Sequence, residues 1–190
     1  MAELAFSEIK QLTGINLATS IPIYFKDYNF SNNAGYVLGE GIYLNPDFFY
    51  NDKEEQLHLI KHEMTLLFFS LYYANTTSFL FSEGVAEYIA HDKSDGWDTS
   101  SLTDNLGEWI DFSYFNYRFN RDVYENIVSD LYSLSHQFVF FWCRTYGEES
   151  LFELYPVITA GNIIEKLEEY SNNTFREINN RFLDYSGVSP

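Results

Sequence analysis

The chain has 190 residues, of which 46% are hydrophobic and 19% are aromatic. This composition provides enough apolar side chains for a folded core and argues against a disordered chain. The 28 acidic and 11 basic residues give a formal net charge of −17, which repels phosphate backbones and anionic membrane surfaces. We therefore expect neither a nucleic-acid partner nor a membrane partner, and the charge favours a basic one.

The sequence also bears on the compartment. Cys143 is the only cysteine, so an internal disulfide is excluded. The N-terminal stretch MAELAFSEIK has neither the basic region nor the apolar run of a signal peptide. No uncharged apolar stretch reaches the length needed to span a membrane. We expect a protein of the cytoplasm or of another soluble compartment.

The first elements are a helix and a small sheet. Leu4, Ile9 and Leu12 have helical spacing over residues 2–13, and Gly14 is suited to end that helix. IPIYF, which begins at Ile21, predicts a short strand. AGYVLGEGIYLNP, which follows, predicts two strands around a tight Gly-Glu-Gly turn, as in a β-hairpin.

The apolar spacing then changes to that of helices. Asp52 followed by Glu55 resembles a capping box, and the pattern beyond it predicts a buried helix over residues 53–74. FLFSEGVAEYIAH predicts a second, shorter helix over residues 79–91. Residues 92–107 are polar and rich in turn-forming residues, which predicts a surface loop.

The remaining chain is predicted to be helical. An amphipathic segment covers residues 121–145 and is closed by Gly147, and the next segment is interrupted by Pro156. Asn162 with Glu165, and Thr174 with Glu177, have the spacing of helix starts. We therefore predict a single α+β domain over residues 1–190. It has a helix, a small mixed or antiparallel sheet and two motif helices in residues 1–91, then the loop, then a helical part in residues 108–190.

The stretch LIKHEMTLLFF contains His62 and Glu63, the first two residues of a His-Glu-x-x-His pattern. In that pattern two histidines on one helical face bind zinc, and the glutamate is the general base for the bound water. The second histidine would stand at position 66, on the same face as His62. The chain has Leu66 there.

The order HEM, then LFSEGVAEYIA, resembles the gluzincin class of zinc metallopeptidases, whose second motif is often Trp-Leu-Ser-Glu-Gly-hydrophobic-Ala-Glu-Tyr. The likeness extends over most of residues 20–185. It includes the hairpin in the place of the family's edge strand and the helices that follow FVFFWCRTYGEE. The resemblance implies a zincin-like fold with His62 as first metal ligand, Glu63 as general base and Glu83 as third ligand. It also implies that Glu87 orients His62.

Leu66 leaves this ligand set incomplete, because catalytic zinc normally has three protein ligands. We therefore expect a metallopeptidase-like protein that has lost peptidase activity and acts by binding a protein or peptide. An extended segment would pair along the GYVLGEGIYLNP edge. In this interpretation Glu63 is a vestigial base and the protein carries no cofactor. Any metal that it does bind is expected to be zinc.

Other interpretations remain open. His58 precedes His62 by four residues and His91 follows Glu87 by four, so a metal could bind one turn away, at His58, His62, Glu87 and His91. The chain would then be an active metal-dependent hydrolase or peptidase with a shifted ligand set. His62 and Glu63 could instead be polar residues of an ordinary core helix. A third possibility is an acidic protein that inhibits a nucleic-acid-binding partner by mimicking nucleic acid.

Overall fold

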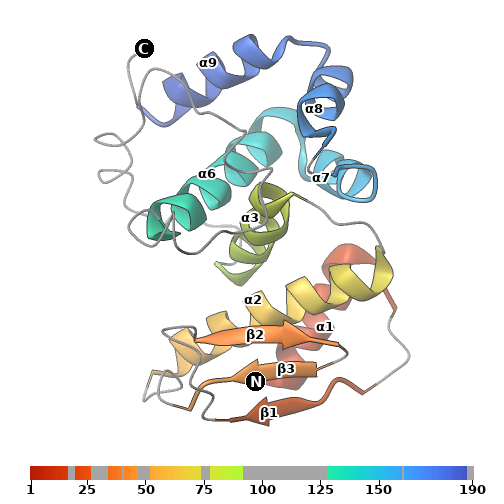
Figure 1. Ribbon diagram of the computed structural model, residues 1–190, viewed down its shortest axis with the longest axis vertical. Coiled ribbons are helices and arrows are strands. Elements are labelled where there is room, and N and C mark those ends of the chain that lie inside the picture. The colour runs from red at the N-terminus through yellow and green to blue at the C-terminus, as the bar shows by residue number, and fades with distance from the viewer. Residues whose placement is uncertain are drawn as a thin grey trace. The chain divides into compact units, whose positions relative to one another are not determined.

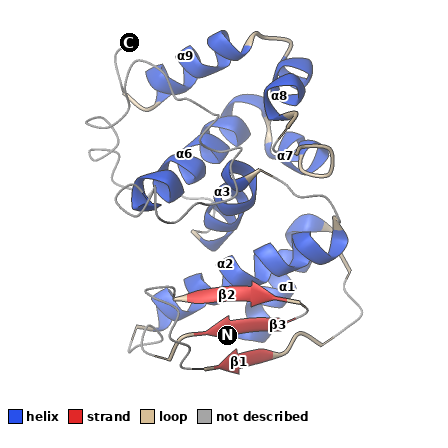
Figure 2. Ribbon diagram, in the orientation of Figure 1, coloured by secondary structure: helices blue, strands red, loops and turns tan. Residues whose placement is uncertain are grey.

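A computed structural model gives the fold (Figure 1). It describes residues 1–16, 20–26, 34–39, 41–46, 52–73, 78–91, 128–159 and 161–187. In this part of the chain the fold is mixed α+β, with one three-stranded sheet and seven helices (Figure 2). The predicted loop over residues 92–107, residues 108–127 and the first seven residues of the predicted helix 121–145 lie outside the described residues.

The chain forms two compact units. The N-terminal unit contains Met1–Ala74 and Ile89–Asp92, and the C-terminal unit contains Asn75–Tyr88 and Lys93–Pro190. Helix α3, Phe79–Ala90, is continuous through the boundary between them. Among the described helices, none combines the length and the apolar character needed to cross a membrane.

The sheet lies in the N-terminal unit and has the strand order β1-β3-β2. Strands β2, Gly35–Leu38, and β3, Gly41–Leu44, pair antiparallel, which confirms the predicted hairpin. Strand β1, Ile23–Phe25, pairs parallel with β3. The sheet is therefore mixed.

A row of three tyrosines crosses the sheet on one face. Tyr43 of β3 is in register with Tyr24 of β1 and with Tyr36 of β2. The ring centroids lie 4.8 Å apart for Tyr24 and Tyr43, and 5.0 Å apart for Tyr36 and Tyr43. Ile42 and Leu44 alternate with Tyr43 and are fully buried, because successive residues of a strand point to opposite faces. The helices of this unit lie on one side of the sheet (Figure 1).

Helices α1, Ala2–Thr13, and α2, Lys53–Tyr72, match the predicted ones closely. Gly14 ends α1 in the left-handed conformation with φ 69°, which glycine adopts without steric cost. Asp52 caps α2 by accepting a hydrogen bond from the backbone N–H of Glu54, at 2.8 Å. Asp52 therefore caps the helix as predicted. The backbone N–H that it binds belongs to Glu54, the second residue of the helix, and not to Glu55 as a capping box would require.

Helix α2 contacts β2 and β3 and also packs against α1. Phe6 meets Phe68 edge to face at a centroid distance of 5.1 Å. Beside this apolar contact, the ammonium of Lys61 lies 2.8 Å from a carboxylate oxygen of Glu8. The Lys61 side chain is only 4% exposed and that of Glu8 is 44% exposed, so the ion pair joins the buried face of α2 to the surface of α1.

The C-terminal unit is built from helices. They are α3, α6 (Val128–Tyr146), α7 (Glu148–Leu154), α8 (Ile163–Ser171) and α9 (Phe175–Tyr185). Gly84 of α3 lies directly against α6, since a Cβ atom at Gly84 would be 2.5 Å from the backbone oxygen of Ser135. Phe81 and Phe138 pack edge to face beside this contact. The small residue therefore permits the close approach of the two helices.

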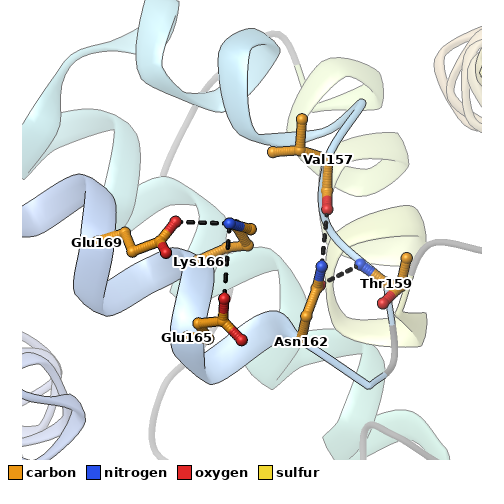
Figure 3. A network of polar contacts seen from close by, with 6 residues as sticks. All are labelled: Val157, Thr159, Asn162, Glu165, Lys166 and Glu169. Atoms are coloured by element: carbon orange, nitrogen blue, oxygen red, sulfur yellow. Dashed lines mark hydrogen bonds and ion pairs between the residues drawn. The ribbon is translucent and has the colours of Figure 1, made fainter.

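The last two helices begin differently, although both were predicted from similar spacing. Thr174 and Glu177 form the full capping box of α9. Asn162 precedes α8 without capping it, because its side-chain oxygen accepts from the Thr159 backbone N–H and its amide donates to the Val157 carbonyl. Figure 3 shows this turn. It also shows the Lys166 ammonium, which lies 3.7 Å from a carboxylate oxygen of Glu165 and 2.6 Å from one of Glu169. The predicted helix start at Asn162 is confirmed, although the Asn162 side chain does not cap the helix.

Candidate functional site

His62 and Glu63 lie on the buried face of α2. They are 7% and 5% exposed. Leu66 lies one turn after His62 on the same helix and is half-buried. An isobutyl side chain offers no ligand atom, so the residues at the positions of the zinc-peptidase pattern do not fit a catalytic zinc ion.

The Glu63 side chain packs against strand β2. A Cβ atom at Gly35 would lie 2.8 Å from Oε1 of Glu63, 2.9 Å from its Cγ and 3.0 Å from its Cδ. The carboxyl group is therefore held beside the first residue of the outer strand of the hairpin. The Glu63 side chain fits there because Gly35 has no side chain to occupy the same space.

The two glutamates of the second motif lie one turn apart on α3. Glu83 is half-buried and Glu87 is 7% exposed. Both belong to the C-terminal unit, whereas His62 belongs to the N-terminal unit. Both carboxylates lie on α3, the second helix that the sequence predicted.

His58 and His91, by contrast, meet within the N-terminal unit. Their ring centroids lie 4.2 Å apart, and the rings are tilted by 57°. His58 belongs to α2, and His91 directly follows the last residue of α3. Both side chains are half-buried, so the pair lies at the margin of the core.

Glu87 lies one helical turn before His91. Because α3 is continuous, its backbone fixes Glu87 relative to His91. Ligand atoms of His58, Glu87 and His91 all lie within 4.8 Å of one another. This group contains three members of the predicted shifted set. It does not include His62, Glu63 or Glu83.

Two other polar residues of the C-terminal unit, Tyr88 and His136, are buried in its core. His136 is 1% exposed and packs near the ring of Phe140. Tyr88 donates a hydrogen bond to the carboxylate of Glu148 at 3.4 Å. Burial raises the pKa of Tyr88, and Cys143 and Glu148 beside it add to the effect. The phenol therefore stays protonated, and Cys143 beside it is a buried free cysteine.

Sequence reasoning missed two contacts of α2. The contact between Gly35 and Glu63 had a weak signal, because a glycine at the start of a strand can mark close approach of another group. The ion pair between Lys61 and Glu8 had none, since it depends on how α1 and α2 pack. Both contacts depend on how separate elements pack in three dimensions, which residue spacing does not show.

Comparison with known proteins finds no matching family model, no matching curated protein and no matching solved structure. Functional inference therefore depends on the residues themselves. Three features bear on function: the buried His62 and Glu63, the leucine at position 66, and the group formed by His58, Glu87 and His91.

Proposed function

We propose that this chain is a metallopeptidase-like protein that does not cleave peptides and instead binds an extended segment of a protein or peptide. The observation that carries the proposal is the environment of Glu63. The residue that would serve as general base is buried and packed against the backbone of Gly35. The helix that carries it has Leu66 where the pattern needs a second histidine.

Strand β2 is the surface that suits such a segment. Within the three described strands it pairs on one side, with β3. The Asn45 N–H donates to the Ala34 carbonyl at 2.9 Å, so this pair is hydrogen-bonded, and hydrogen-bonded pairs alternate along an antiparallel ladder. The backbone groups of Gly35 and Val37 consequently point away from β3, where an added strand would use them.

Charge supports a basic partner. The net charge of −17 attracts cationic segments and accelerates their encounter with the protein. Leu38, at the end of β2, is 62% exposed and offers an apolar contact beside the edge. A short peptide that alternates basic and apolar residues fits these features best.

The test uses two assays on the full chain. Fluorescent casein with and without added zinc should show no cleavage above a protein-free control. Short unstructured peptides that alternate lysine or arginine with apolar residues should bind, as measured by fluorescence anisotropy. Val37→Pro should weaken this binding, because it removes an outward N–H without removing a bond to β3. Zinc-dependent cleavage would overturn the proposal, and so would binding that is indifferent to Val37→Pro in a correctly folded variant.

A second experiment tests the likeness to metallopeptidases separately. Leu66→His restores His-Glu-x-x-His on α2. We expect the variant to bind one more zinc ion per chain than the unaltered protein, as counted by elemental analysis after dialysis. The imidazole should cost about 2–4 kcal/mol of stability without metal, because it replaces a half-buried leucine. If Leu66→His binds no more zinc than the unaltered protein, α2 does not present its side chains in the geometry of the zinc-peptidase pattern, and the likeness to metallopeptidases is not supported.

A further inference from the structure

We propose that His58, Glu87 and His91 bind a divalent metal ion of the zinc class, one helical turn away from the place of the metallopeptidase pattern. The proposal is independent of peptide binding. It begins from the two histidines, which α2 and the end of α3 bring to a ring separation of 4.2 Å. Both lie in the N-terminal unit, so the pair is set by the packing of one compact unit.

The third ligand follows from helical geometry. Glu87 and His91 are four residues apart, and such residues project from the same face of a helix, one above the other. Glu87 is 7% exposed, and a carboxylate with that little access to water is stabilised by a cation. The ligand atoms of the three residues lie within 4.8 Å of one another.

Two imidazoles and one carboxylate are ligands that zinc prefers. Zinc in a tetrahedral site lies roughly 2.0–2.2 Å from such ligands, which places the ligand atoms roughly 3.3–3.6 Å apart. Rotation of the two half-buried imidazoles can close the group from its present spacing. Three protein ligands leave a fourth position for water. The negative field of the chain further raises the local concentration of cations.

The ion would serve to hold structure. In the metallopeptidase pattern the residue directly after the first histidine is the catalytic glutamate, but here His58 is followed by Leu59. Peptide hydrolysis by that mechanism therefore does not follow from this site. A metal at His58 and His91 would instead tie α2 to the end of α3 and stabilise the folded state, because it binds that state alone.

The experiment measures zinc binding by the full chain, prepared without a histidine tag and stripped with a chelator. Titration calorimetry with zinc chloride should give one ion per chain, and zinc should raise the melting temperature. His58→Ala, His91→Ala and Glu87→Gln should each weaken zinc binding about tenfold or more. Glu87→Gln keeps the shape of the side chain, so it tests the site even if a histidine variant folds poorly.

His62→Asn is the matched control, since His62 lies on the same helix one turn from His58 but outside the group. It should leave zinc affinity within about twofold, a difference well below the effect of losing a ligand. Cobalt in place of zinc should give the visible absorption of a nitrogen- and oxygen-ligated ion, and His58→Ala should abolish it. The proposal is overturned by absence of zinc binding, or by binding that survives in the double variant His58→Ala with His91→Ala. The second result would indicate only adventitious binding to acidic surface residues.

Discussion

Glu63 and Gly35 are in direct contact: the position of a Cβ atom on Gly35 is only 2.8 Å from a carboxylate oxygen of Glu63. Non-bonded atoms cannot approach that closely, so any side chain at position 35 must displace the glutamate. The close packing of helix α2 on strand β2 at this contact therefore requires a glycine at position 35. The conformation of the candidate base depends on this glycine.

Gly35→Ala should therefore destabilise the N-terminal unit by about 1–3 kcal/mol, the usual cost of overpacking a buried site. Glu63→Ala should remove most of that cost, because the methyl group introduced at position 35 then has room. Urea denaturation of the two single variants and of the double variant measures the coupling. If the two costs simply add, the contact is not what restricts position 35.

Gly84→Ala should be more damaging, because the obstacle is backbone. The new methyl group would lie 2.5 Å from the Ser135 oxygen and 2.7 Å from a Val139 methyl carbon, so α3 and α6 would have to separate. We expect a loss of about 3 kcal/mol, at the upper end of the range for overpacking. Gly161→Ala is the control, since the nearest atom to its Cβ position is 3.9 Å away. Equal melting temperatures for the two variants would contradict the close packing of α3 on α6.

The ion pair of Lys61 and Glu8 gives a third prediction. Glu8→Gln should destabilise the protein by about 1–3 kcal/mol, because it removes a counter-charge that lies 2.8 Å from a buried ammonium. Lys61→Met should cost less, since it removes the buried charge together with its desolvation penalty and keeps an apolar side chain. Thermal unfolding at low and high salt compares them. A larger loss for Lys61→Met than for Glu8→Gln would contradict this ranking.

The capping box of α9 predicts a dependence on pH. Hydrogen bonds from the backbone and hydroxyl of Thr174 lower the pKa of Glu177 below its ordinary value of 4.5. A carboxylate whose pKa is lower in the folded state stabilises that state above pH 4.5 and loses this effect as the pH falls through the folded pKa. Thr174→Ala should cost about 1 kcal/mol at pH 7, and less in acid. Glu177→Gln should remove this pH dependence, and a constant cost across the titration would disprove the linkage.

Much of the fold could be predicted because it depends on local signals. The two strands around Gly39 and the helix starts at Asp52 and Thr174 depend on residues close to one another in the chain. Asn162 shows the limit of such signals. Its side-chain oxygen accepts from the Thr159 N–H and its side-chain amide donates to the Val157 carbonyl, so the oxygen that could cap the helix is already engaged.

The candidate site could be predicted only in part, because it combines two helices. The spacing of His58 to His62 and of Glu87 to His91 was visible in the sequence, and three of these four residues form the observed group. What spacing could not show is how far α2 is rotated about its axis. That rotation brings His58 to His91, and it follows from the packing of α2 on α1 and the sheet.

The row of Tyr24, Tyr43 and Tyr36 has a consequence for how β1 finds its place. A hairpin turn sets the register of β2 on β3, but β1 pairs with β3 in parallel, and a tight turn cannot join two parallel neighbours. A slip of one residue would move Tyr24 to the opposite face and bring Ile23 or Phe25 beside Tyr43. The 4.8 Å stack would then be lost. The stacked tyrosines therefore favour the observed register of β1 on β3 over registers shifted by one residue.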